Sequence, residues 1–504
     1  MEKLVKLLKN PYLYLTLILV LGFLLRLYKI DNPIADWHSW RQADTAAVAR
    51  NFYKEGFNPF LPRGDDMSSI SEIKPQLNLN RYRFVEFPIY PSLVYFGYLL
   101  NGGVDERIAR LVSVLFSLGS MTFIYFIVKK NSTTVHALLS SLIFATLPFS
   151  IYYSRVTLPE PSLIFFSLGM FYFVDRWISE NEAGFFSLGK KTALLVLSIF
   201  FTACAFLTKP MAVFFLMPLC YSYFKKEGFR FPALRYWLLI IVALVPFGLW
   251  RIWMQNFAEG IPASSWLLNG NGIRLRPAFF RWLVGDRLGR EILSITGGAL
   301  FLLGLVIKPL AKSNYLLHLL TLSSFLYLVV FATGNVQHDY YQYLLIPVLS
   351  IFLARGVWLL FQGFPFLLPR IISIPLAIFL LGITYYLTWY EVKGLYQVNN
   401  WAIVHGGVAA DKLLPKDALV VAPYMGDTAF LYQTNRHGFP IINSTVEEMK
   451  KDYGITGYVS TTNDTKTAWL AEKYNLLEKT DEYIVIDLTK INPDFTDKDS
   501  KEPL

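Results

Sequence analysis

The residues best suited to chemistry lie in a short polar stretch at residues 34–56. It contains Asp36, His38, Arg41 and Asp44. A carboxylate can accept a proton during catalysis, and Arg or His can hold an anion. The stretch therefore offers a general base and anion-binding groups close together in the sequence.

A helix is predicted to position these groups, because residues 37–55 contain neither Gly nor Pro. Asp36 is expected at the N-cap and Gly56 just past the helix end. The alternative is that Asp36 only caps the helix. A capping Asp is ionised at neutral pH, so the two roles do not exclude each other.

Further polar groups occur in short turns between apolar blocks. Each has a structural explanation alone, such as a helix-end pair, a lysine whose ammonium reaches the interface, or belt tyrosines. Together they indicate a site at the membrane surface. They are Glu86 in VEFP, Arg155 and Glu160 in SRVTLPEP, Lys209 in LTKP, and His338, Asp339, Tyr340 and Tyr341 in QHDYYQ.

A second basic group lies in the segment 255–290. Two explanations remain open for it: phosphate binding, and contact with anionic lipid. Its arginines are Arg274, Arg276, Arg281, Arg287 and Arg290.

The composition identifies the environment of these groups. Of 504 residues, 54% are hydrophobic and 17% charged, against about 25% charged in soluble domains. This excludes a soluble enzyme and indicates an integral membrane protein. The net charge of +10 lies between apolar blocks, so positive-inside bias explains it and no nucleic-acid partner is expected. Cys204 and Cys220 lie inside apolar blocks and imply no disulfide framework.

Eleven transmembrane helices are predicted from apolar runs long enough to approach a bilayer crossing. They are 12–28, 107–128, 135–153, 161–177, 192–208, 210–224, 236–254, 291–307, 315–334, 342–360 and 371–389.

The apolar segment 87–100 is too short for a span and contains two prolines. Lys and Arg residues between the spans concentrate on the cytoplasmic side of the membrane only if the segment 87–100 is interfacial or re-entrant. This gives a multi-pass protein of the cytoplasmic (inner) membrane with a cytoplasmic N-terminus. The loops 31–106 and 255–290 are then external.

Residues 391–504 form a different kind of chain. They hold 12 Lys and Arg against 17 Asp and Glu, whereas the first 390 residues hold 35 and 20. Strands are predicted at 418–422, 458–460 and 483–486, and helices at 427–433, 446–453 and 466–474. The chain is thus divided into a membrane domain, 1–390, and a small soluble extracytoplasmic α/β domain, 391–504. The second domain contains no recognisable catalytic motif, so recognition or packing is its expected role.

In order and spacing, these motifs resemble those of membrane glycosyltransferases of the C-type (GT-C) fold. The resemblance is to the bacterial protein O-mannosyltransferase and lipid A aminoarabinose transferase group, and it covers about residues 1–390. The family often has adjacent acidic residues in its first motif, whereas here Trp37 follows Asp36. The matching motifs are DWHSWRQADTA, Glu86-Phe87-Pro88, Arg155 with Glu160-Pro161, Leu207-Thr208-Lys209, and His338 to Tyr341.

The resemblance implies inverting transfer of a sugar, hexosyl or pentosyl, from a polyprenyl-phosphate donor to an acceptor hydroxyl on a protein, glycolipid or wall polymer. Asp36 is the first choice for the base, with Asp44 and Glu86 as alternatives. No cofactor is certain, and a divalent metal is compatible with the carboxylates. The implied substrate-binding residues are His38, Arg41, Arg155, Glu160, Lys209, Arg274, Arg276, His338, Tyr340 and Tyr341.

Other functions stay open at this point. A transporter or flippase for lipid-linked sugars should show charges at mid-span or internal repeats, and neither is evident. A ligase would differ only in using a diphosphate-linked donor. A scaffold would not need the charged turns.

Overall fold

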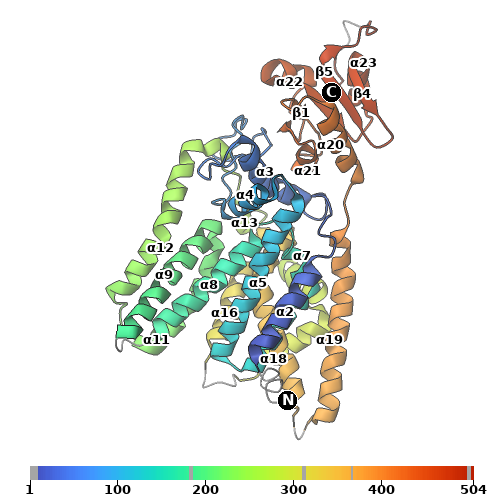
Figure 1. Cartoon of the computed structure of the whole chain (residues 1–504). Helices are drawn as coiled ribbons and strands as arrows, with labels where there is room; N and C mark the ends of the chain where they lie inside the picture. The colour runs from blue at the N-terminus through green and yellow to red at the C-terminus, as the bar shows by residue number, and fades with distance from the viewer. Residues whose placement is uncertain (1–9, 181–184, 309–313, 365–366, 497–500, 504) are drawn as a thin grey trace. The chain divides into compact units, whose positions relative to one another are not determined.

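The computed structural model describes residues 10–180, 185–308, 314–364, 367–496 and 501–503 (Figure 1). The chain forms two compact units. The first contains residues 1–30, 110–253 and 264–394, and the second contains 31–109, 254–263 and 395–504. The loop 31–109 thus belongs to the same unit as the C-terminal α/β domain.

The first unit is built from helices (Figure 1). Its longer members are α2 (Pro11–Arg26), α5 (Glu106–Asn131), α6 (Thr134–Thr146), α8 (Glu160–Ser179), α9 (Phe185–Thr208), α12 (Leu234–Trp253), α15 (Ser294–Val306), α16 (Leu316–Val330), α18 (Ile346–Gln362) and α19 (Arg370–Val392). Shorter elements join them: α7 (Pro148–Tyr153), η1 (Pro210–Ala212), α10 (Val213–Leu216), α11 (Leu219–Glu227), α13 (Trp266–Asn269), α14 (Pro277–Phe280), η3 (Arg281–Ile292), α17 (Ala332–Gln337), η4 (Asp339–Leu345) and η5 (Lys393–Tyr396), which ends in the second unit.

Helical elements lie in each of the eleven predicted spans, but fewer of these helices are long enough to cross a bilayer. Among the described residues, five helices are long and apolar enough to cross a bilayer, or six if the pair 277–292 and 294–306 is one bent span. That pair bends by 104°, at Ser294, whose φ is +56°. Three further apolar helices, α2, α6 and α16, are shorter.

Prolines divide two predicted spans. The segment 135–153 is interrupted between α6 and α7 at Leu147, immediately before Pro148. The segment 210–224 consists of η1, α10 and α11, with Pro218 before the last. Proline lacks the N–H that a continuous helix needs, so each of these two segments is a broken helix.

Close packing in this unit depends on small residues. Helices α15 and α18 lie against each other. A Cβ at Gly304 would come within 2.0 Å of the carbonyl oxygen of Phe352, and one at Gly356 within 1.9 Å of that of Leu300. The two backbones can approach this closely only because both positions are glycine.

The second unit combines helices with a five-stranded sheet of order β2-β1-β3-β5-β4. Strand β1 is parallel to β2 and β3, and β5 is antiparallel to β3 and β4. The strands are β1 (Leu419–Val421), β2 (His437–Phe439), β3 (Gly457–Ser460), β4 (Tyr474–Lys479) and β5 (Ile484–Ile491). The helical elements are α3 (Ser39–Glu55), α4 (Ile89–Asn101), η2 (Met254–Gly260), α20 (Trp401–Leu413), α21 (Thr428–Gln433), α22 (Val446–Tyr453) and α23 (Thr465–Lys473).

The α/β character of residues 391–504 was predicted, but strands β2 and β4 and helix α20 were not. Helix α3 shares a core with this domain, because Ala43, Ala46 and Ala47 are buried in one cluster with Phe430 and Leu431. Because alanine side chains are small, the C-terminal domain can pack closely against α3, the helix that follows the predicted base Asp36.

The start of α3 differs from the prediction. The helix begins at Ser39, and its N-cap is His38, which has a left-handed backbone with φ of +55°. The expectation that Asp36 is the N-cap was therefore wrong. Gly56, with φ of +104°, follows the last residue as expected.

Candidate active site

Asp36 is held at a fixed position before α3. Its side chain is fully buried and accepts a hydrogen bond from Nε2 of Gln42 at 2.6 Å. Nδ2 of Asn399 donates to the backbone carbonyl of Asp36 at 3.0 Å. Gln42 also donates to the carbonyl of Trp37 at 2.9 Å. These bonds orient the Asp36 carboxylate and the backbone on either side of it.

The other two candidate bases each bind an arginine. Nη2 of Arg41 lies 2.9 and 3.1 Å from the two carboxylate oxygens of Glu86. Arg83 forms an ion pair with Oδ2 of Asp44. Thr428 donates to Oδ1 of Asp44 at 2.9 Å. A nearby cation favours the ionised carboxylate, which makes it a weaker base than an unpaired one.

The same groups surround a small cavity of about 20 Å³, enough for about one water molecule. Arg41, Asp44, Arg83 and Glu86 all line it. Arg41, which was predicted to bind substrate, is ion-paired with Glu86 in this structure. Arg83 was missed by the sequence analysis, although it lies three residues before Glu86.

In the first unit, a compact group forms around Lys209. Its ammonium pairs with Oε1 of Glu160. It also lies 5.4 Å from the ring centre of Tyr341 and 6.0 Å from that of Tyr340. The His338 ring stacks on Tyr340 at 5.4 Å. The structure thereby brings together five of the predicted residues.

Glu160 in this group has an unused acceptor. Its side chain is buried, and Oε2 has no hydrogen-bond partner among the described residues. A buried carboxylate oxygen without a donor is costly. A hydroxyl donor supplied by a substrate would satisfy it.

Three predicted arginines have other surroundings. Arg155 is fully buried and donates to the carbonyl of Lys29 at 2.6 Å. Arg274 donates to the carbonyl oxygens of Val330 at 2.8 Å and Leu268 at 3.0 Å. Arg276 is exposed. The contacts of Arg274 are structural ones that join its loop to the end of α16.

The structure adds Asp339 to the candidate residues. Its side chain is buried, accepts a hydrogen bond from the Tyr153 hydroxyl at 2.5 Å, and lies 3.6 Å from Nη1 of Arg287. Trp266 contacts His338 edge-on at 5.6 Å. The sequence analysis named Asp339 within QHDYYQ but assigned it no role.

The predicted residues are divided between the units. Asp36, His38, Arg41, Asp44 and Glu86 belong to the second, and the remaining ones to the first. Among the described residues, no group of three or more His, Cys, Asp or Glu side chains could hold a metal ion.

A buried charge cluster supports the helix that follows Asp36. Arg50 of α3 pairs with Asp65 and lies 4.0 Å from the ring centre of Tyr432. His437 of β2 lies 3.3 Å from Asp65 and 3.0 Å from Glu55. The cluster ties α3 to the sheet.

The charges in this cluster shift its titration. Burial opposes ionisation, but Arg50 and His437 outweigh it and lower the pKa of Asp65 to about 2. For Glu55, burial is likewise outweighed by His437 and Arg81, which lower the pKa to about 2. For His437, burial is outweighed by hydrogen bonds to Asp65 and Glu55, which raise its pKa.

A pH dependence of stability follows from these directions. Charged His437 stabilises the fold below its unfolded pKa of about 6.5, and this is lost as the pH rises through the higher folded pKa. The carboxylates contribute above about pH 4 and lose their contribution as the pH falls toward 2.

We expect His437→Gln to lower the thermal unfolding midpoint more at pH 6 than at pH 9. His405→Gln, at an exposed pair with Glu482, should show a smaller difference. An equal loss at both pH values for His437→Gln would contradict the charge assignment.

Comparison with known proteins gives one family match. Residues 74–231 match the family described as dolichyl-phosphate-mannose-protein mannosyltransferase. This segment contains Glu86, Arg155, Glu160 and Lys209. An uncharacterized protein of Aquifex aeolicus (strain VF5) is 39% identical over 107 residues, which is 21% of this chain and 25% of that protein. The match thus spans about a quarter of that relative's length.

Solved structures match over nearly the whole chain. ArnT from Cupriavidus metallidurans bound to undecaprenyl phosphate superposes with a TM-score of 0.63 at 14% identity, over 95% of this chain and 98% of that one. The Archaeoglobus fulgidus oligosaccharyltransferase gives 0.56 at 10% identity, over 95% and 74%. The mycobacterial arabinofuranosyltransferase AftD gives 0.54 at 12%, over 90% and 35%.

These matches support a multi-pass membrane protein. At identities of 10–14% the superpositions establish the fold alone. The resemblance inferred from the motifs is confirmed: the chain has the GT-C fold of the membrane glycosyltransferases.

Proposed function

We propose that this protein is an inverting glycosyltransferase that moves a sugar from a polyprenyl-phosphate donor to an acceptor hydroxyl, with Asp36 as the general base. The reaction takes place at the outer face of the cytoplasmic membrane. One observation carries the choice of base. The Asp36 carboxylate is fully buried just before α3 and is oriented by a 2.6 Å hydrogen bond from Nε2 of Gln42.

The chemistry is a single displacement. The acceptor oxygen attacks the anomeric carbon, and Asp36 accepts the hydroxyl proton as the new C–O bond forms. The bond between the anomeric carbon and the phosphate oxygen breaks on the opposite face through an oxocarbenium-like transition state. The phosphate monoester departs with the bonding electrons, so no acid is required.

The leaving phosphate needs cations and hydrogen-bond donors. Lys209, with His338 and the two tyrosines packed beside it, supplies a point charge and donors of this kind. Arg155 is the second cation we assign to the phosphate. Oε2 of Glu160, which has no partner among the described residues, is suited to accept a hydrogen bond from a sugar hydroxyl.

The comparisons support this donor class. One matched structure is bound to undecaprenyl phosphate. The description of the matched family names dolichyl-phosphate-mannose. The first compound is a polyprenyl monophosphate, and the second is a sugar carried on one. We propose that the acceptor is a protein, a glycolipid or a wall polymer. We also propose that the C-terminal α/β domain contacts this acceptor.

The experiment uses the purified full-length protein in lipid with a panel of polyprenyl-monophosphate sugars and a crude membrane acceptor. Release of polyprenyl phosphate is followed with time. Release that depends on one donor and on acceptor supports the proposal. No release with any monophosphate donor, together with movement of intact donor across the bilayer, would favour a flippase. Release only from diphosphate-linked donors would favour a ligase.

Removal of the Lys209 charge should slow the reaction strongly. We expect Lys209→Met to lower kcat/KM for the donor by about 10²-fold, the effect typical of losing one group that stabilises a developing charge. Glu160→Gln should act mainly through the sugar, changing the preference among donors. Lys74→Met, which removes a lysine paired with Glu259 at 3.2 Å, is the matched control. An effect of Lys74→Met as large as that of Lys209→Met would contradict the assignment.

A further inference from the structure

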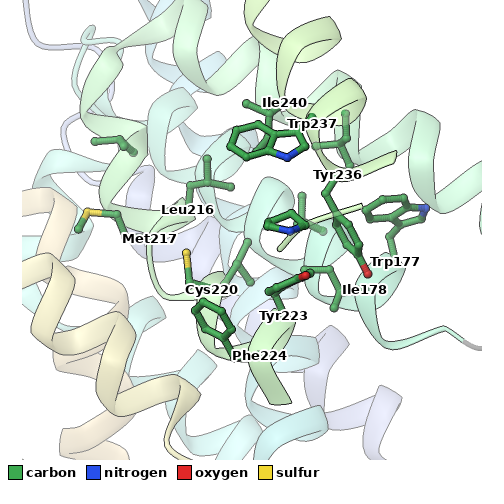
Figure 2. Close-up of a pocket in the computed structure, with 15 residues that line it drawn as sticks. Trp177, Ile178, Leu216, Met217, Cys220, Tyr223, Phe224, Tyr236, Trp237 and Ile240 are labelled. Carbon is green, nitrogen blue, oxygen red and sulfur yellow. The ribbon is translucent and has the colours of Figure 1, made fainter. Parts of the chain in front are cut away.

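The first unit contains an apolar pocket that the proposed reaction does not use. Helices α8, α10, α11 and α12 surround a cavity of about 310 Å³ (Figure 2). This volume is within the range of about 300–1,000 Å³ of ligand sites. Fifteen residues line it, none of them charged, including Ile178, Leu216, Met217, Cys220 and Ile240.

The tyrosine hydroxyls at the pocket are already bonded to protein groups. The hydroxyl of Tyr223 donates to the carbonyl of Arg230 at 2.9 Å. That of Tyr236 donates to Glu227 at 2.9 Å. A polar ligand would find little to bond with, so the chemistry of the lining fits a hydrocarbon chain.

The pocket is open toward apolar surroundings. Met217, Phe224 and Trp237 line it, and 44%, 42% and 41% of their surfaces are exposed. In a membrane-spanning unit, exposed side chains of this type face lipid. A hydrocarbon chain can therefore enter from the bilayer.

The chain around the pocket is basic. Segments 175–180 and 225–235 adjoin lining residues. Together they hold three carboxylates, Asp175, Glu180 and Glu227, and five cations: Arg176, Lys225, Lys226, Arg230 and Arg235. We call these five residues the basic rim. Its excess of positive charge complements an anionic headgroup.

Aromatic residues flank the rim as they do at membrane interfaces. Phe229 and Phe231, on either side of Arg230, are 96% and 83% exposed. The ring of Phe229 stacks on Phe224 at 5.2 Å, and Phe231 lies 5.9 Å from Trp237. The loop that carries Arg230 is thus joined to the open side of the pocket.

We propose that this pocket binds an acyl chain of an anionic phospholipid, whose phosphate is held by the basic rim. The apolar cavity accounts for the chain, and the adjacent cations account for the charge of the headgroup. Under the positive-inside topology the lipid belongs to the cytoplasmic leaflet. The proposal does not depend on the transferase reaction.

The test is native mass spectrometry of delipidated full-length protein titrated with dioleoyl phosphatidylglycerol or dioleoyl phosphatidylcholine. These lipids share their chains and differ in charge. We expect phosphatidylglycerol to bind at lower concentration. The triple variant Lys225→Gln, Lys226→Gln, Arg230→Gln should lose at least about fivefold in affinity for it, the change associated with one cation near an anionic lipid surface. Lys308→Gln, which removes an exposed lysine that does not line the pocket, should retain the wild-type affinity.

A second variant tests the cavity itself. Leu216→Trp fills part of the pocket and should weaken both lipids without changing their ratio, and its thermal unfolding midpoint reports whether it is folded. Equal binding of the two lipids by wild type would show that the basic rim does not hold the headgroup phosphate. Unchanged phosphatidylglycerol binding by folded Leu216→Trp would show that the pocket does not hold the acyl chain. Displacement of phosphatidylglycerol by equimolar undecaprenyl phosphate would also overturn the proposal, because the occupant would then be a donor-type chain.

Discussion

Asp36→Asn is expected to lower the rate of sugar transfer by about 10²–10⁴-fold, the contribution typical of a positioned general base. The amide is nearly isosteric with the carboxylate but cannot accept the proton of the acceptor hydroxyl. Binding of the polyprenyl-phosphate donor should remain close to wild type. Single-turnover release of polyprenyl phosphate measures the first quantity, and titration with unreactive polyprenyl phosphate measures the second.

Two matched variants separate the base from its acidic neighbours. Asp44→Asn breaks the ion pair with Arg83, and Glu86→Gln weakens the one with Arg41. Both should lower the thermal unfolding midpoint, because each leaves a poorly compensated arginine in a largely buried site. Full activity of Asp36→Asn with loss of activity in Glu86→Gln would transfer the base to Glu86.

The largest expected change in stability comes from the buried pair of Arg50 and Asp65. Their side chains are only 6% and 3% exposed. Asp65→Asn should destabilise the second unit by about 3–5 kcal/mol, because it leaves the Arg50 guanidinium buried without its carboxylate. The thermal unfolding midpoint of the purified protein, measured at pH 7.5, reports the loss.

An exposed pair supplies the control for this prediction. Arg107, 61% exposed, pairs with Asp105 in the same unit, and exposed pairs contribute little. Asp105→Asn should leave the midpoint unchanged. A second comparison uses Arg50→Met with Asp65→Leu, which removes both charges and should cost less than Asp65→Asn alone. Equal midpoints for wild type and Asp65→Asn would show that the pair does not stabilise the unit.

The amino-acid sequence determined the class of protein and the location of most of its elements. Long apolar runs such as 371–389 and 236–254 correspond to α19 and α12, because apolar periodicity is a local property of the chain. The segment 87–100, which was predicted to be interfacial or re-entrant, corresponds to α4. The order of short motifs was enough to recognise the GT-C fold.

The tertiary structure decided the roles of individual charges. Arg41 and Glu86 are 45 residues apart in the sequence, and Thr428 and Asp44 are 384 apart. No local pattern records which of several carboxylates an arginine will meet, since that depends on how distant segments fold together. The sequence made Asp36 the first choice for the base, with Asp44 and Glu86 as alternatives, but it could not predict the ion pairs that Asp44 and Glu86 form.

Backbone geometry was the other quantity that the sequence did not determine. The preference of Asp for the N-cap predicted Asp36 there, but His38 occupies that position with a left-handed backbone. The bond from the Trp37 amide to the carbonyl of Leu395, at 3.3 Å, fixes the chain just before the helix. Such a contact between segments more than 350 residues apart overrides the local N-cap preference of Asp, which is worth about 1 kcal/mol. The first residue of the helix and the surroundings of the proposed base are therefore determined only in the folded chain.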